Sequence, residues 1–78
     1  LSSRWNQAIE YFTKLVTEQP ELDGAWYDLG VAWEAYGDWG NALYAYEQAA
    51  ARKRSGAYLD AVATARQRAP ISAKESTP

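Results

Sequence analysis

A repeat of about 34 residues constrains the fold of this chain more than any other feature of its sequence. Displacing the chain by that spacing aligns Trp5 with Trp39 and Phe12 with Tyr46. Three further pairs match in the same way: Ala8 with Ala42, Ile9 with Leu43, and Leu15 with Ala49. Within each copy these residues lie three and four positions apart, a spacing that places side chains on one face of an α-helix. The repeat therefore predicts stacked amphipathic helices.

The same periodicity predicts an all-α domain over residues 1–69, built from about four helices. We expect the helices at about 4–18, 24–36, 39–52 and 57–68, joined as antiparallel hairpins. Residues 70–78 are polar and lack periodicity, so a disordered C-terminal tail is expected there. A folded chain of this size gains a stability on the order of 4 to 12 kcal/mol.

Residues that favour helix ends support these boundaries. Ser2 or Ser3 is the expected N-cap of the first helix, and Asp23 is the expected N-cap of the second. Gly37 tolerates a positive φ and Asp38 is a good N-cap, so this pair predicts a tight turn between two helices.

The last helix is rich in Ala and Arg, which suits a solvent-facing cap on a helical stack. We expect Leu59, Val62, Ala63 and Arg66 on one of its sides.

The segment Trp26-x-x-Leu29-Gly30-x-x-Trp33, followed by Ala42 and Tyr46, resembles the tetratricopeptide repeat, whose pattern is W-x₂-L-G-x₂-Y and then A-x₃-F. The resemblance covers one complete repeat, about 23–56, preceded by the second helix of another repeat and followed by a capping helix. It implies antiparallel hairpins stacked as a short right-handed α-solenoid. In that pattern Gly30 lies where two helices approach closely. Two residues depart from the pattern: Trp33 replaces the usual Tyr, and Arg54 replaces the closing Pro.

In proteins with this repeat, the first helix of each pair lines a groove that commonly holds a peptide or a helix of a partner protein. The resemblance thus implies a groove formed by Tyr27, Val31, Glu34, Tyr58 and Val62. A subgroup of the family grips a C-terminal carboxylate with Lys, Asn and Arg, and those residues are missing from the corresponding positions here. The chain is therefore expected to bind another protein and to help assemble a larger complex, without clamping a carboxylate.

A second interface is predicted on the opening helix, which lacks a hairpin mate and carries apolar residues along one side. Its candidate residues, with an exposed tyrosine of the third helix, are Trp5, Ile9, Tyr11, Phe12 and Tyr44. The tryptophans fall on repeat positions and are interpreted as packing residues. The alternative to partner binding is a structural role, in which the chain associates with itself or with a neighbouring domain and its groove stays empty.

Composition argues against most other functions. The chain has no Cys and no His, which removes thiolate nucleophiles, imidazole bases and the usual zinc ligands. Its net charge of -2 argues against nucleic-acid binding, and no apolar run is long enough to span a bilayer. No Gly-rich phosphate loop is present. We therefore expect no enzymatic activity, cofactor or metal; the compartment is not readable, and the cytoplasm is the default expectation for a chain soluble as given.

Overall fold

The computed structural model describes residues 2–69, with the side chains of Ser2 and Ser3 left aside. Four helices follow one another: α1 (Ser2–Glu18), α2 (Asp23–Tyr36), α3 (Trp39–Arg52) and α4 (Gly56–Arg68). The prediction of an all-helical chain is confirmed for these residues, which contain no strand. The tail predicted for 70–78 lies outside the described residues.

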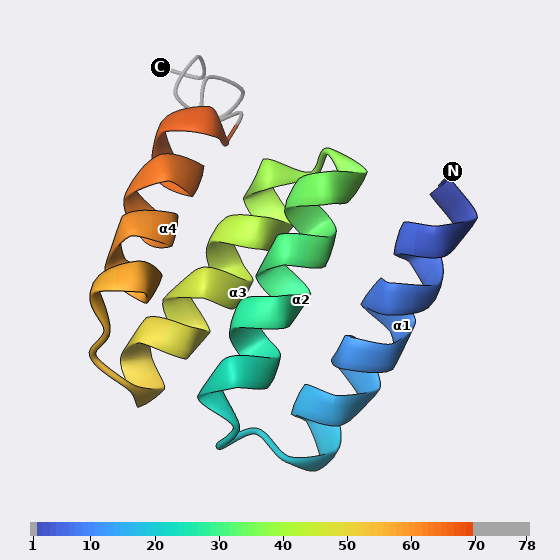
Figure 1. Cartoon of the computed structure of the whole chain (residues 1–78), viewed down its shortest axis with the longest axis horizontal. Coiled ribbons are helices and arrows are strands. Elements are labelled where there is room, and N and C mark those ends of the chain that lie inside the picture. Colours follow the sequence, from blue (N-terminus) through green and yellow to red (C-terminus); the bar gives the residue numbers. More distant parts are fainter. Residues whose placement is uncertain (1, 70–78) are drawn as a thin grey trace, which may run out of the picture.

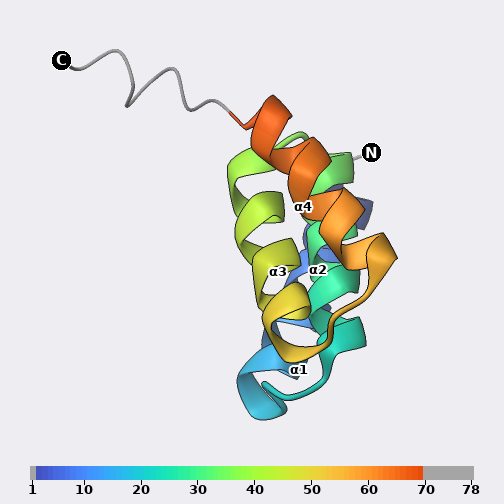
Figure 2. The same ribbon diagram turned by 90° about the vertical axis from the view of Figure 1, so that its left-hand side faces the viewer.

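Consecutive helices run in opposite directions and each contacts the next along the chain (Figure 1). The view from the side shows α3 on one side of the molecule and α2 on the other (Figure 2). An aromatic contact between Tyr27 and Tyr58 joins α2 to α4, so these two helices share one face.

The helix starts differ from the predicted ones. α1 begins at Ser2, so the serines expected to precede it lie within it. Asp23 is the first residue of α2 and does not cap it: the N-cap is Leu22, which makes no side-chain bond to the helix. The carboxylate of Asp23 instead accepts a hydrogen bond from Tyr58.

The turn between α2 and α3 has the predicted construction. Gly37 ends α2 with a φ of 102°, a left-handed conformation that costs a glycine little. Its N–H donates to the carbonyl of Glu34, and the N–H of Asp38 donates to the carbonyl of Trp33. These two bonds form the Schellman arrangement that closes many helices. Asp38 then caps α3 by accepting from the N–H of Asn41 at 3.0 Å.

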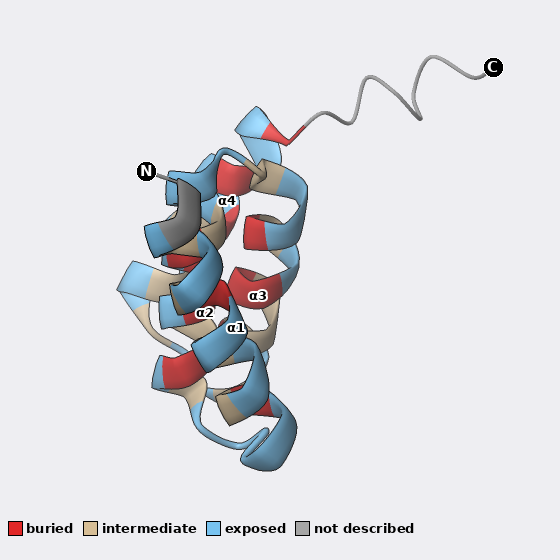
Figure 3. Ribbon diagram, turned by 90° about the vertical axis from the view of Figure 1, so that its right-hand side faces the viewer, coloured by how far each residue is buried: buried red, intermediate tan, exposed pale blue. Residues whose placement is uncertain are grey.

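Two clusters of buried residues hold the helices together. The first joins α1 to α2 and contains Ile9, Val16, Leu29 and Ala32, with Trp5, Ala8, Phe12, Leu15, Trp26 and Trp33 packed around it. The second joins α3 to α4 and contains Ala42, Tyr46, Val62 and Ala65, with Trp33, Trp39 and Leu43 among the residues around it. Figure 3 shows buried residues where helices meet and exposed residues along the outer side of α1.

The loop between α1 and α2 is tied to the end of α3 through one backbone oxygen. The carbonyl of Pro20 accepts a hydrogen bond from the indole Nε1 of Trp26 at 2.8 Å and another from Nε of Arg52. The guanidinium of Arg52 also lies 5.1 Å from the centre of the Trp26 ring. The loop after α1, the start of α2 and the end of α3 therefore meet at this carbonyl.

Candidate protein-binding groove

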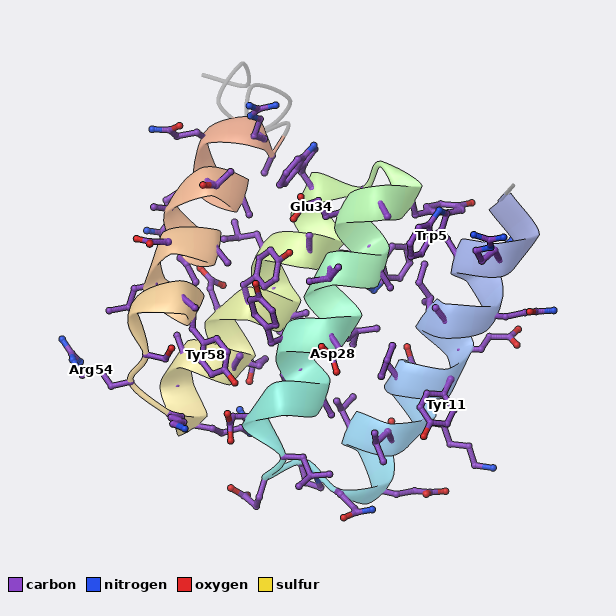
Figure 4. All side chains as sticks on the ribbon, in the orientation of Figure 1. Trp5, Tyr11, Asp28, Glu34, Arg54 and Tyr58 are labelled. Atoms are coloured by element: carbon purple, nitrogen blue, oxygen red, sulfur yellow. The ribbon has the colours of Figure 1, made fainter. Side chains whose placement is uncertain are left out.

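An open hollow of about 370 Å³ lies on the face shared by α2 and α4. Its lining residues come from α2 and α4, and α3 contributes Tyr46. In Figure 4 the Tyr58 side chain lies between α4 and α2. The lining residues are Tyr27, Glu34, Tyr46, Ala57, Asp60, Ala61 and Thr64. The four from α4 are spaced as one helical face, since they lie at i, i+3, i+4 and i+7.

Three tyrosine rings form a continuous aromatic row in and beside this hollow. Tyr27 occupies the middle, with its ring centre 5.4 Å from that of Tyr46 and 5.2 Å from that of Tyr58. The Tyr27 and Tyr58 rings are stacked, with 30° between their planes. Such aromatic pairs contribute about 0.5–1.5 kcal/mol beyond their buried area. The row therefore fixes the orientation of the rings that face the hollow.

Tyr46 is held in place by a close approach of α2 and α3. It is only 2% exposed, and a Cβ built on Gly30 would lie 2.4 Å from its Cε1. The predicted packing role of Gly30 is thus confirmed, because any side chain there would meet this ring. The Tyr46 hydroxyl donates to Oε1 of Glu34 at 2.6 Å. Burial, followed by this hydrogen bond and the Glu34 charge, raises the pKa of Tyr46 well above its usual value.

Tyr58 is anchored at one end of α2. Its hydroxyl donates to Oδ2 of Asp23 at 2.5 Å, across 35 positions of sequence. That hydrogen bond, followed by burial and the charges of Asp23 and Asp28, raises the pKa of Tyr58 to about 12. Tyr46 and Tyr58 therefore act as neutral hydrogen-bond donors at physiological pH.

The charged groups of the groove are acidic. Glu34 and Asp60 line the hollow, and Asp23 and Asp28 lie close enough to Tyr58 to raise its pKa. Three arginines make their contacts elsewhere in the fold. Arg66 forms an ion pair with Glu47 at 3.0 Å, Arg68 lies 5.6 Å above the Trp39 ring, and Arg52 binds the loop after α1.

The structure brings some of the predicted groove residues together and separates others. Tyr27 and Glu34 line the hollow, and Tyr58 stacks beside it. Val31 is 39% exposed and is not part of the lining. Val62 was predicted to face the groove but is buried at 9% exposure in the cluster between α3 and α4. Its side chain supports the floor and is not accessible to a partner.

The residues predicted to share one side of α4 are mostly exposed, as a solvent-facing cap would have them, and Val62 is the exception. Leu59 is 44% exposed and Ala63 and Arg66 are also exposed, whereas Ala65 is fully buried. Alanine packs as readily against a helix as it faces water, so the apolar residues of α4 alone did not show which side of that helix is buried. A helical face drawn from Ala57 through Asp60 and Thr64 would have found the groove residues that the sequence analysis missed.

The predicted second interface is divided between core and surface. Ile9 is buried at 9% exposure, and Trp5 and Phe12 pack against the cluster between α1 and α2. Most of the apolar side of α1 is therefore covered by α2. Tyr11 and Tyr44 are exposed at 63% and 55%, as expected. The Tyr44 ring meets Trp26 edge-on, with 6.0 Å between ring centres.

A second hollow, of about 550 Å³, lies at the turn between α2 and α3. It is lined by Tyr36, Gly37, Asp38, Trp39 and Arg68. Its charged groups already have partners within the fold, because Asp38 caps α3 and Arg68 covers the Trp39 ring. The groove between α2 and α4 differs in that Asp60 makes no hydrogen bond or ion pair within the described residues.

Within residues 2–69, no three or more acidic, Cys or His residues gather in a way that could hold a metal ion. None of the four described helices is both long and apolar enough to span a membrane, as predicted. Comparisons with protein-family models, with curated proteins and with solved structures found no match to this chain.

Proposed function

We propose that this chain is a tetratricopeptide-type interaction module that binds another protein through the groove between α2 and α4. Its role is to scaffold or assist the assembly of a larger complex, with no catalytic step of its own. In this proposal α2 and α3 form one complete repeat, α1 is the second helix of the repeat before it, and α4 is a cap. The hairpins would stack as a short right-handed solenoid.

Sequence and geometry together support the repeat assignment. The paired residues of the 34-residue repeat fall in α1 and α3, which occupy equivalent places in successive hairpins. Gly30 and Tyr46, which stand at the small and large positions of the repeat pattern, are in direct apposition. Packing a ring against a glycine lets the two helices of a hairpin come close without leaving a cavity.

One observation carries the functional proposal: the hollow between α2 and α4 presents tyrosine rings and unpaired carboxylate oxygens on the same face. Tyrosine is enriched where proteins bind one another, because it supplies a large rigid surface and a polar tip. The row of Tyr27, Tyr46 and Tyr58 is held by hydrogen bonds to Glu34 and Asp23, so little ordering remains to be done on binding.

Photo-crosslinking from native extract tests the proposed location. A photoreactive amino acid placed at Thr64, which lines the hollow, should capture a protein partner. The same amino acid at Thr13, which is exposed on α1, is the matched control. Capture through Thr13 alone would move the interface to the outer side of α1 and contradict the proposal.

A pair of double variants tests the energetics of the same site. Tyr27→Ala with Tyr58→Ala should abolish retention of the captured partner in a pull-down. Tyr11→Ala with Tyr44→Ala removes two tyrosines from the other surface and should retain it. Helicity measured by circular dichroism verifies that both variants fold.

Self-association is the alternative, and the exposed rings of Tyr11 and Tyr44 are the observation that favours it. Sedimentation equilibrium over a range of concentrations separates the two functions. A dimer that Tyr11→Ala with Tyr44→Ala dissociates, together with no capture at Thr64, would favour the structural role.

A further inference from the structure

We propose that the groove takes a lysine or arginine side chain from a basic segment of its partner. This inference rests on the proposed function and adds the chemistry of what is bound. The observation behind it is the combination, in one hollow, of aromatic faces and carboxylates with no basic residue among the lining.

The charge of the groove is one-sided. Glu34 and Asp60 line it, and Asp23 and Asp28 flank the Tyr58 end. Glu34 and Asp23 each spend one oxygen on a tyrosine hydroxyl, which leaves the other oxygen free of protein partners in the described chain. Asp60 makes no hydrogen bond or ion pair with the described residues. A cation entering the hollow would therefore meet several carboxylate oxygens that can accept hydrogen bonds.

The aromatic row adds a second attraction for a cation. An arginine or ammonium group placed over a tyrosine ring is attracted by the negative face of the ring. The chain already uses this contact twice within its own fold, at Arg52 over Trp26 and at Arg68 over Trp39. The half-buried ring of Tyr27 lines the hollow, and no Arg or Lys lies among the lining residues.

The size of the hollow agrees with a side chain as the occupant. Its volume of about 370 Å³ is at the small end of the range for ligand pockets. A bound helix would need a longer apolar trough, whereas the floor here is short and its rim is acidic. The geometry fits one or two long side chains, with the peptide backbone lying across the open mouth.

Fluorescence anisotropy with labelled model peptides tests the inference. The probes are short capped peptides in which alanine alternates with arginine, with glutamate or with serine. Only the arginine peptide should bind, and its affinity should fall as salt is raised, because exposed charges are screened over about 10 Å at 0.1 M salt.

Matched variants separate the groove from the overall charge of the protein. Glu34→Gln with Asp60→Asn keeps the hydrogen-bond acceptor for Tyr46 and should weaken binding of the arginine peptide by about five- to tenfold. Glu10→Gln with Glu18→Gln changes the net charge equally on the exposed side of α1. This control should stay within about twofold of the unchanged protein.

Other results would contradict the inference, the proposed function, or both. Equal weakening in both double variants would mean non-specific attraction, and the inference would fail. Binding of the glutamate or serine peptide in the groove would show that the partner is not basic, while the proposed function stands. No peptide binding together with no capture at Thr64 would remove both.

Discussion

The contact between α1 and α2 and the contact between α3 and α4 are built from different kinds of side chain. The first distributes its packing over many large residues, among them Ile9, Phe12 and Trp26. The second has a single large, fully buried side chain, Tyr46, beside the small residues Ala42 and Ala65, and the large residues around it are only partly buried. Buried apolar area sets the stability of a helix contact, so the second contact depends on fewer residues.

Polar contacts partly compensate for the smaller number of packing residues that hold α4. Tyr58 bonds to Asp23 across the groove, and Arg66 pairs with Glu47 on the surface. Exposed ion pairs of this kind contribute about 0–1 kcal/mol. We therefore expect α4 to open more readily than α1, although it forms one wall of the proposed binding groove. Regions that bind ligands are often drawn from the less stable parts of a fold.

The largest expected effect comes from removing the one large buried residue of the second contact. Tyr46→Ala should lower the free energy of unfolding by about 3–5 kcal/mol, as deletion of a buried aromatic ring typically does. Urea denaturation followed by circular dichroism measures the loss. Tyr44→Ala, which truncates an exposed tyrosine of the same helix, should cost less than about 1 kcal/mol. Similar losses in both variants would contradict the concentration of packing on Tyr46.

The second-largest effect is expected at Gly30, where α2 and α3 approach closely around the Tyr46 ring. Gly30→Ala should destabilise the chain by up to about 2 kcal/mol, because overpacking costs about 1–3 kcal/mol and the helix gains about 1 kcal/mol. Gly24→Ala introduces the same methyl group where no atom lies within 4 Å and should stabilise by about 0.4–1 kcal/mol. Opposite signs in thermal or urea unfolding are expected. A stabilising Gly30→Ala would show that Tyr46 can move aside.

Alkaline pH should weaken the tyrosine side of the molecule specifically. The pKa values of Tyr46 and Tyr58 are raised in the folded chain, so their bonds stabilise it fully below pH 10, the ordinary pKa of tyrosine. This contribution is lost as the pH rises from 10 through about 12, where Tyr58 titrates. Stability measured over this window should fall less steeply in Tyr46→Phe and in Tyr58→Phe than in the unchanged chain. Parallel curves would show that the hydroxyl bonds contribute nothing.

The smallest effect is expected from the bond across the groove. Tyr58→Phe keeps the ring on Tyr27 and removes only the donor to Asp23, so it should cost about 0.5–1 kcal/mol. Native-state hydrogen exchange should show faster exchange at α4 amides and little change at α1 amides. Equal acceleration in both helices would mean that α4 does not open separately.

The sequence was sufficient for the parts of the fold that depend on local periodicity and on special backbone positions. The repeat predicted four helices, and the pair Gly37-Asp38 predicted the turn between α2 and α3. The close approach at Gly30 was also predictable, because a glycine inside an amphipathic helix usually marks tight packing. In each case the signal lies within a few residues of the feature.

The candidate groove depends on contacts that no local pattern encodes. The bonds of Tyr46 to Glu34 and of Tyr58 to Asp23 join residues 12 and 35 positions apart. Asp23 looked like a helix cap because aspartate favours that position, and its cross-groove partner was decided by tertiary packing. Val62 was placed in the groove because the alanines around it carry no information about which side of α4 is buried.

The carbonyl of Pro20 determines which substitutions the junction between the α1–α2 loop and α3 can tolerate. A main-chain oxygen is present whatever residue occupies position 20, so mutation of that residue leaves the acceptor in place. The identities that matter are those of the two donors, Trp26 and Arg52. A substitution at position 20 should therefore leave the acceptor in place, whereas a substitution of Trp26 or Arg52 removes one of its two donors.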